Sequence, residues 1–381
     1  MMKKYYQICA IVLFVAVLFC VPVCFFLQDD KEFSENENRY LAQRPDMSAE
    51  DVLSGEFMED TEQYINDQFP QKDFWTGFKS DLLRLTGSRE IGGVYLAKDG
   101  YLIEKWLPED FDRQLLAANT ETVSSFAALH PEQKVSLMLV PTAGMILGDK
   151  LPKGAPMFDQ EIAYEIVREN LDGADLVDLN PLFIQHSAEA LYYKTDHHWT
   201  SRGAFLAYCA WCEMNGQSAD SDDFEIETVT AEFQGTLHSK VLGTHCPFDS
   251  IELYRRKDEL PCHVEFNFGK THSETVFAMD RLSQKDKYQV FLNGNHPEIT
   301  IKTAQTNGKH LLMIKDSFAN AFIPFLIGDY ETIHIIDPRY YYGNIDEYIA
   351  ENDITQCLFL YNIKNFCEDK NISLLSQVNA E

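Results

Sequence analysis

An apolar run ends in a serine at Leu311-Leu312-Met313-Ile314-Lys315-Asp316-Ser317-Phe318-Ala319-Asn320. The run stops at Asp316-Ser317 and resumes as Phe-Ala-Asn-Ala-Phe, which predicts a strand, a sharp turn and a helix from Phe318 to about Ile327. Such a turn exposes the Ser317 hydroxyl at a helix N-terminus, where backbone N–H groups can hold a negatively charged oxygen. The same pattern also fits an aspartate or serine that only caps the helix.

A carboxylate, two imidazoles and an indole share one short loop, Tyr192-Tyr193-Lys194-Thr195-Asp196-His197-His198-Trp199-Thr200. A serine becomes a strong nucleophile when a base removes its proton and a third group orients that base. Asp196 and His198 are two residues apart, so in an extended or turning loop the carboxylate can reach the imidazole. Ser317 follows His198 by 119 residues (317 minus 198). The two stretches together predict a Ser-His-Asp site for acyl transfer, although each short motif also occurs for structural reasons.

The string Asp196-His197-His198-Trp199 resembles the signature of the DHHW family, relatives of the SGNH-like acetyltransferases that decorate alginate and other exported polysaccharides. Five further segments look similar: Glu37 to Leu41, Asp67 to Pro70, Gly93 to Leu102, Lys315 to Phe318 and Ile336 to Tyr341. The resemblance implies a triad of Asp196, His198 and Ser317 in an SGNH-like three-layer α/β/α fold. The Asp-His pair precedes the serine, which implies a permuted motif order. The spacing is Asp-x-His, where the better-known SGNH hydrolases have Asp-x-x-His, and the doubled histidine leaves His197 as a rival base.

The activity that this resemblance implies is O-acetyl transfer to an extracytoplasmic polysaccharide through an acyl-serine, without a cofactor. It also implies a partner, a membrane-bound O-acyltransferase that exports the acetyl group. The same triad would act as a carbohydrate acetylesterase if water resolved the acyl-serine. A third reading is a non-catalytic glycan-binding scaffold of a polysaccharide-assembly complex, with aromatic side chains stacking on sugars.

Residues beside these motifs are candidates for contacting the substrate or the oxyanion. An Asn-Gly unit can supply an N–H and an amide, although it is equally an ordinary turn. The residues after the predicted strand Thr332 to Ile336 lie where ligands gather in parallel sheets, although Arg339 is equally suited to an ion pair with Asp337 or a neighbour. The candidates are His197, Trp199, Gly294, Asn295, Phe318, Asn320, Arg339 and Tyr340.

Composition excludes some functions. The chain has 381 residues, 45% of them hydrophobic, which is enough for a sizeable core. Its formal net charge of −28 argues against nucleic acid as a partner, because phosphate binding needs clustered Lys and Arg. The same charge would repel an anionic polymer and therefore favours a neutral glycan as acceptor.

The N-terminal segment predicts membrane insertion. Residues Ile8 to Leu27 carry no charge, Lys3 and Lys4 precede them, and Asp29 and Asp30 follow. Twenty residues suffice to span a bilayer, and the lysines predict that the body lies outside the cytoplasm. No small-x-small cleavage site is visible, so residues 1–30 are expected to be a retained signal anchor rather than a cleaved signal peptide. Residues 31–90 are expected to be a helical juxtamembrane segment interrupted at Pro70.

Residues 91–381 are expected to form the catalytic domain. Apolar strands alternate with helices, which predicts a mainly parallel sheet covered on both faces, with sites at the carboxyl ends of its strands. Residues of about 217–300 break this alternation and predict a β-rich antiparallel insertion. The predicted strands are Val135–Val140, Asp175–Asp178, Glu298–Thr303, Thr332–Ile336 and Cys357–Tyr361.

Cysteines and histidines in the insertion do not follow a familiar zinc spacing, so no metal site is expected. The residues concerned are His238, His245, Cys246, Cys262 and His263. In an oxidising exterior a Cys246–Cys262 disulfide is the favoured use of the two thiols. Cys209 and Cys212 share a helical face and are expected to be buried in the core.

Overall fold

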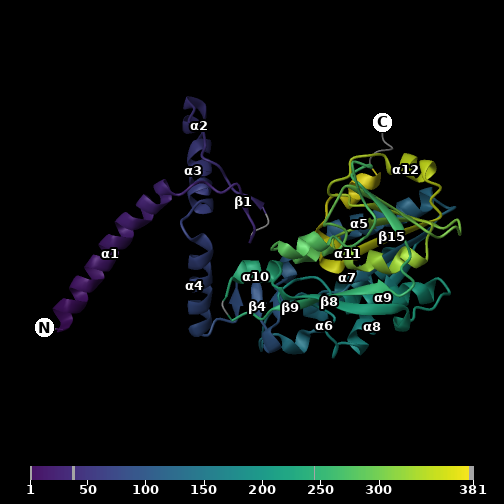
Figure 1. Ribbon diagram of the computed structural model, residues 1–381, viewed down its shortest axis with the longest axis horizontal. Coiled ribbons are helices and arrows are strands. Elements are labelled where there is room, and N and C mark those ends of the chain that lie inside the picture. Colours follow the sequence, from purple (N-terminus) through teal and green to yellow (C-terminus); the bar gives the residue numbers. More distant parts are fainter. Residues whose placement is uncertain (1, 37–38, 244, 377–381) are drawn as a thin grey trace. The chain divides into compact units, whose positions relative to one another are not determined.

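The computed structural model describes residues 2–36, 39–243 and 245–376, so Glu37 and Asn38 lie outside the described residues (Figure 1). The chain divides into two compact units. The first contains Met1–Ser88 with Ser239–His245, and the second contains Arg89–His238 with Cys246–Glu381. The candidate site lies in the second unit.

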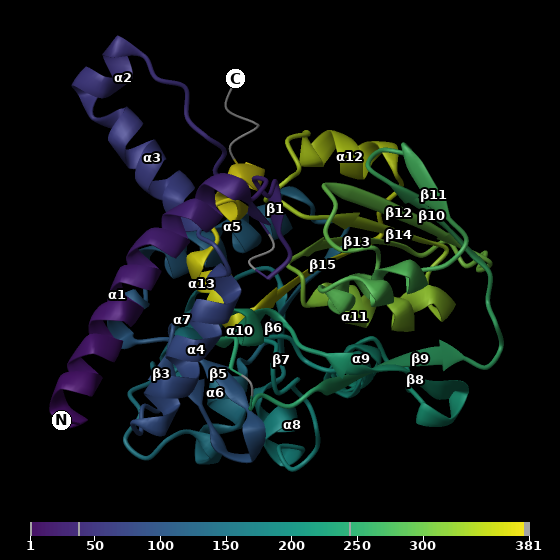
Figure 2. The ribbon, with the colours of Figure 1, turned by 60° about the vertical axis from the view of Figure 1, so that its left-hand side comes forward.

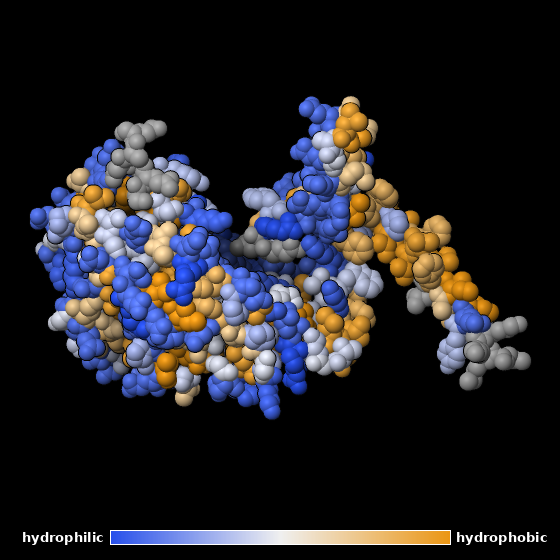
Figure 3. All heavy atoms as spheres, turned by 180° about the vertical axis from the view of Figure 1, so that it is seen from behind, coloured by the Kyte–Doolittle hydropathy of each residue, from blue (hydrophilic) through white to orange (hydrophobic). Residues whose placement is uncertain are grey.

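The first unit begins with the long helix α1 (Met2–Leu27), whose segment Tyr5–Leu27 is long and apolar enough to cross a membrane. Apolar side chains cover this helix (Figure 3). By position it is either a signal sequence or an anchor. The remaining elements of this unit are β1 (Phe33–Ser34), β2 (Arg39–Tyr40), α2 (Ala49–Ser54), α3 (Glu56–Asp67) and α4 (Lys72–Leu85). The break between α3 and α4 falls at Pro70, as predicted.

An ion pair between the partly exposed Arg39 and the buried Asp67 joins two of the segments that carry the family resemblance. Arg39 donates to the Asp67 carboxylate at 2.8 Å, and the backbone N–H of Ala42 donates to the same group at 2.9 Å. The hydrogen bond from Arg39 is the main cause that holds the pKa of Asp67 well below its usual value. These contacts tie the segment after α1 to the end of α3.

The second unit is built on one eight-stranded sheet, and neighbouring strands of it lie side by side in Figure 2. Its parallel part runs in the order β14, β13, β15, β6, β7, and β12, β10 and β11 extend it with antiparallel pairs. The predicted mainly parallel α/β architecture is therefore confirmed. The strand bounds are β6 (Lys134–Val140), β7 (Asp175–Asp178), β10 (Cys262–Phe266), β11 (Thr271–Ser273), β12 (Glu298–Thr303), β13 (His310–Lys315), β14 (Thr332–Ile336) and β15 (Gln356–Asn362).

Helices cover both faces of this sheet because alternate side chains of each strand point to opposite sides. In β13, Leu311 and Met313 belong to one core, whereas Leu312 and Ile314 belong to the other. The first core is covered by α8 (Asn180–Gln185), α9 (Ser201–Met214), α11 (Ala319–Phe322) and the 3-10 helix η7 (Ile323–Gly328). The second is covered by α5 (Arg113–Leu129), α7 (Glu161–Asn170), α12 (Ile345–Glu351) and α13 (Ile363–Glu368).

The β-rich region predicted at about 217–300 divides into two parts. Strands β8 (Phe224–Phe233) and β9 (Asp249–Arg256) pair only with each other in the described chain, whereas β10, β11 and β12 extend the central sheet. The 3-10 helices η5 (Met279–Ser283) and η6 (Lys287–Val290) lie between β11 and β12. Elsewhere β3 (Glu90–Ile91), β4 (Val94–Leu96) and β5 (Leu102–Glu104) form a small sheet. Two further short α-helices are α6 (Ala143–Ile146) and α10 (Thr236–Val241).

The predicted Cys246–Cys262 disulfide is wrong, because the structure joins neither cysteine to another. Cys262 is buried in β10 and its thiol lies 4.0 Å from the carbonyl oxygen of Glu274, whereas Cys246 belongs to the loop before β9. The two cysteines therefore sit on different β structures. Cys212 is buried, as predicted, whereas Cys209 is only partly buried and packs against the same core.

Candidate active site

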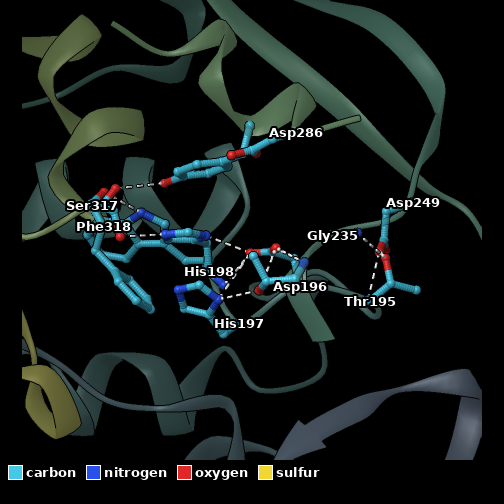
Figure 4. Close-up of polar contacts among 12 residues, drawn as sticks. Thr195, Asp196, His197, His198, Gly235, Asp249, Asp286, Ser317 and Phe318 are labelled. Atoms are coloured by element: carbon cyan, nitrogen blue, oxygen red, sulfur yellow. Dashed lines mark hydrogen bonds and ion pairs between the residues drawn. The ribbon is translucent and has the colours of Figure 1, made fainter. Parts of the chain in front are cut away.

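The structure brings Asp196, His198 and Ser317 into one hydrogen-bonded chain (Figure 4). The Asp196 carboxylate lies 2.6 Å from Nδ1 of His198, and Nε2 of His198 lies 2.8 Å from the Ser317 hydroxyl. A carboxylate only accepts, so Nδ1 carries the proton and Nε2 is left to accept the hydrogen bond that Ser317 donates. This is the arrangement in which an imidazole can take a proton from a serine.

The Asp196 carboxylate is held by groups besides His198. The backbone N–H of Thr236 donates to it at 2.7 Å and the Thr236 hydroxyl at 3.1 Å, while the backbone N–H of His198 donates at 2.9 Å. Burial alone would raise the pKa of Asp196, but the charges of His198 and His197 and the hydrogen bonds from His198 hold it well below its usual value. The carboxylate is therefore ionised and fixed toward the imidazole.

Gly235 explains how Thr236 comes so close to Asp196. A methyl group built on Gly235 would overlap the Asp196 carboxylate. Only glycine leaves room for the backbone of this loop to lie against the carboxylate. Gly235 and Thr236 follow β8, and no sequence motif marks them. Thr236 lies 40 residues after Asp196 in the sequence.

A second buried carboxylate fixes the loop that carries Asp196. Asp249, at the start of β9, accepts hydrogen bonds from the backbone N–H groups of Lys194 and Thr195 at 2.8 Å each and from the Thr195 hydroxyl at 2.6 Å. The Thr195 hydroxyl in turn accepts from the backbone N–H of Gly235 at 3.2 Å. Asp249 thus connects the loop to both strands of the β8–β9 pair.

Ser317 lies two residues after Lys315, the last residue of β13, at the carboxyl end of the parallel strands. Asp316 shapes this turn, since its carboxylate accepts from the backbone N–H groups of Phe318 at 2.9 Å and Asn362 at 2.8 Å. The helix that the sequence predicts from Phe318 to about Ile327 is a short α11 that continues as the 3-10 helix η7. Pro324 lies at this transition and cannot donate the α-helical hydrogen bond.

Trp199 and Phe318, which the sequence offered as substrate contacts, are buried and position the backbone. The Trp199 indole N–H donates to the carbonyl oxygen of Phe318 at 2.9 Å. The Phe318 ring lies 5.0 Å from the His198 ring between centroids. These contacts join the histidine loop to the serine turn.

Tyr288 contacts both halves of the site, and the sequence reasoning missed it. Its ring stacks on His198 and its hydroxyl donates to the carbonyl oxygen of Ser317 at 3.3 Å. It belongs to η6, inside the β-rich region, where no motif points to it. Only the fold places this residue beside the histidine.

His197 is hydrogen-bonded away from the serine. Its Nδ1 lies 2.7 Å from the Thr236 hydroxyl and 3.7 Å from Asp196, and about a third of the side chain is exposed. Burial of the ring, followed by the charge of His198, lowers the pKa of His197 to about 4. Ser317 donates its hydrogen bond to His198, which is therefore the stronger candidate for the base.

Four of the remaining candidates gather around Lys315 or its partner Asp337. The buried Lys315 ammonium donates to the side-chain oxygens of Asn295 at 2.8 Å and Asn320 at 2.9 Å, and it lies 3.5 Å from Asp337. The Asn320 amide lies 3.4 Å from the carbonyl oxygen of Gly294. Burial lowers the pKa of Lys315 to about 8, although Asp337 opposes the shift.

Arg339 makes the ion pair that the sequence left open. Its guanidinium donates to both oxygens of Asp337, at 2.8 and 2.6 Å. Tyr340 beside it is about half exposed, and the Arg339 guanidinium lies 5.5 Å from its ring centroid. Arg339 therefore neutralises Asp337, and Tyr340 is the member of this group that faces solvent.

A small cavity adjoins the site. It has a volume of about 30 Å³, and its lining includes His197, Phe318, Asn362, Asn365 and the Glu104–Lys364 ion pair. A water needs roughly 10 to 15 Å³ of such space, so the cavity admits only a small group.

Two groups of residues in the described chain carry enough ligand atoms to hold a metal ion. The first is Asp196, His197 and His198, whose atoms are engaged in the hydrogen bonds described above. The second is His263, Glu265 and His272, on the β10–β11 hairpin.

Comparisons with known proteins identify the family of this chain and relatives that share its fold. Residues 131–336 match the family model described as DHHW protein. The chain is 26% identical over 224 residues to the probable alginate O-acetylase AlgJ of Pseudomonas syringae pv. tomato, a match covering 55% of this chain and 56% of that protein. The chain thus spans about half the length of this relative.

Solved structures share the fold. A DHHW family protein from Eubacterium siraeum superimposes with a TM-score of 0.64 at 24% identity, covering 75% of this chain and 96% of that one. PatB1 of Bacillus cereus gives a TM-score of 0.63 at 21% identity, covering 72% and 97%.

Proposed function

Because the chain belongs to the DHHW family, we propose that it is an O-acetyltransferase that forms an acyl intermediate on Ser317. One observation carries the proposal: the hydrogen-bonded chain from Asp196 through His198 to the Ser317 hydroxyl, with distances of 2.6 and 2.8 Å. Similarity to a probable alginate O-acetylase supports acetyl transfer in particular.

In the first half-reaction His198 Nε2 takes the Ser317 proton while Ser317 Oγ attacks the carbonyl carbon of an acetyl donor. Asp196 stabilises the imidazolium that forms. The imidazolium then protonates the leaving group, and acetyl-Ser317 remains. Backbone N–H groups at the serine turn, with Gly294 and Asn295 as further candidates, would hold the oxyanion.

In the second half-reaction a sugar hydroxyl gives its proton to His198 and attacks the acetyl carbon. Ser317 Oγ leaves with the proton from the imidazolium, and the acetylated sugar departs. Water in place of the sugar would give an acetylesterase with the same residues.

The proposed acceptor is an extracytoplasmic polysaccharide. The apolar helix α1 supports export, and we infer that it is retained as an anchor with the second unit outside the cytoplasm. The net charge of −28 favours a neutral glycan over an anionic one. A membrane-bound O-acyltransferase is the proposed source of acetyl groups. The chain order Asp196, His198, Ser317 supports an SGNH-like fold with permuted motifs.

The test is an assay of the full chain in detergent with p-nitrophenyl acetate, with and without a neutral oligosaccharide. Acetylated oligosaccharide would establish transfer, acetate release alone would establish an esterase, and glycan binding without turnover would support the scaffold. Ser317→Ala is expected to lower turnover by at least about 10³-fold. Ser283→Ala, which changes an exposed serine of η5, is the matched control and is expected to retain wild-type turnover.

A further inference from the structure

The β10–β11 hairpin brings three metal-ligating side chains to one face of the sheet. His263 and Glu265 are two residues apart on β10, so they point to the same side. His272 on β11 lies directly opposite Glu265 in the antiparallel register. The side chains of directly opposite residues on neighbouring strands point to the same face of the sheet, so His272 lies on the same face as His263 and Glu265.

The ligand atoms of these residues are close together. One nitrogen of each histidine and one oxygen of Glu265 all lie within 4.8 Å of one another. The two imidazole rings are 5.4 Å apart between centroids and nearly parallel, at 22°. Nε2 of His263 lies 3.7 Å from Glu265, so a rotamer adjustment suffices to direct all three atoms to one ion.

A fourth residue orients His263. Glu274 lies 2.8 Å from Nδ1 of His263, so Nδ1 donates to this carboxylate and Nε2 is left unprotonated toward Glu265 and His272. A carboxylate that fixes the tautomer of a histidine in this way is the usual outer partner of a metal-bound imidazole.

We propose that His263, Glu265 and His272 form a binding site for a divalent transition-metal ion, with Zn²⁺ as its favoured occupant. Two imidazole nitrogens and one carboxylate oxygen suit zinc, and water would complete its coordination. Lys302 would compete with the ion for Glu265, since its ammonium lies 2.8 Å from one oxygen of that carboxylate. Lys302 is more than half exposed, so it can swing into solvent when an ion enters.

The site stands apart from the catalytic residues and suggests a structural task. Register places His263 level with Lys302, and Lys302 level with Thr332, the first residue of β14. Ser317 instead lies two residues after Lys315, the last residue of β13, at the opposite end of these strands. β11 has only three residues and lies at the end of the sheet, so an ion shared with β10 would clamp an otherwise weakly held edge strand.

The test is calorimetric titration of Zn²⁺ into the chelator-treated full chain in detergent. His263→Gln and His272→Gln are expected to abolish one binding event. Glu274→Gln is expected to weaken the same event by about tenfold or more. Lys302→Met, which removes the competing ammonium, is expected to tighten it. His186→Gln is the matched control, because His186 faces Glu189 at 2.6 Å without a second histidine, and it is expected to bind as wild type.

Binding at Asp196, His197 and His198 would appear as a separate event that survives in His272→Gln. The proposal is overturned if His272→Gln retains every event at wild-type affinity, or if Lys302→Met leaves the affinity unchanged or weaker. Hydrogen exchange adds a second readout in the wild-type chain. Zn²⁺ is expected to slow exchange of the β10–β11 amides, and unchanged exchange at saturating Zn²⁺ would contradict the clamp.

Discussion

Tyr288 lies flat against His198, with ring centroids 3.9 Å apart and ring planes 10° from parallel. The Tyr288 hydroxyl also reaches the backbone carbonyl of Ser317. One buried side chain therefore limits the rotation of the imidazole and contacts the turn that carries the serine. His198 is held on one edge by Asp196 and on one face by Tyr288.

We expect Tyr288→Leu to lower kcat/KM for p-nitrophenyl acetate by roughly three- to tenfold, because aromatic stacking contributes about 0.5 to 1.5 kcal/mol. Tyr288→Phe keeps the ring and loses only one long hydrogen bond, so it is expected to stay within about threefold of wild type. Equal losses in the two variants would assign the effect to the hydroxyl and contradict a role for stacking.

The doubled histidine gives the next prediction. His198→Gln is expected to lower kcat by about 10³-fold or more, because it removes the base that accepts the Ser317 proton. His197→Gln is expected to stay within about tenfold of wild type, because His197 bonds to Thr236 instead. Initial rates at saturating p-nitrophenyl acetate measure both. A larger loss in His197→Gln than in His198→Gln would reverse the assignment of the base.

The next prediction concerns Gly235, which lies far from Ser317 in the sequence. Gly235→Ala forces the Asp196 carboxylate to move, so kcat is expected to fall by about 100-fold or more. Gly148→Ala is the control, since a methyl group there meets nothing within 4 Å. Rates are compared after circular dichroism has shown that both variants are folded. Wild-type kcat in a folded Gly235→Ala would mean that the position of Asp196 is unimportant.

The sequence could indicate Asp196, His198 and Ser317 because their signals are local: two short motifs, one at the end of an apolar strand. It could not indicate Thr236, Gly235, Asp249 or Tyr288, because ordinary loop and turn residues acquire these positions only through tertiary contacts. The disulfide prediction failed for the same reason. An oxidising environment favours disulfides in general, but it does not show which elements of the fold carry the two thiols.

Two further features of the sequence indicated part of the structure: a lysine at the end of an apolar strand, and the short runs within 217–300. Lys315 ends an apolar strand, and a buried ammonium requires partners, which the structure supplies as Asn295, Asn320 and Asp337. The short runs within 217–300 predicted antiparallel strands. They could not show that β10 to β12 would join the central sheet, because strand neighbours are chosen by the fold.

His334 makes the fold sensitive to acid. It is buried in β14 with Nδ1 at 2.9 Å from the Tyr348 hydroxyl. Burial, followed by the nearby positive charges of His310 and Lys302, lowers the pKa of His334 to about 4, and Glu265 opposes the shift. In the unfolded chain a histidine titrates near pH 6.5, so between about pH 6.5 and 4 the unfolded state binds more protons.

Stability is therefore expected to fall as the pH falls through this window. From pH 7 to pH 5 the His334 contribution amounts to about 2 kcal/mol of unfolding free energy. Urea unfolding followed by near-ultraviolet circular dichroism at the two pH values measures it. His334→Gln is expected to reduce the difference between pH 7 and pH 5 by about this amount, whatever its own effect on stability at pH 7. His245→Gln, which changes an exposed histidine, is the control. If His334→Gln keeps the full wild-type pH dependence, the buried imidazole does not cause it.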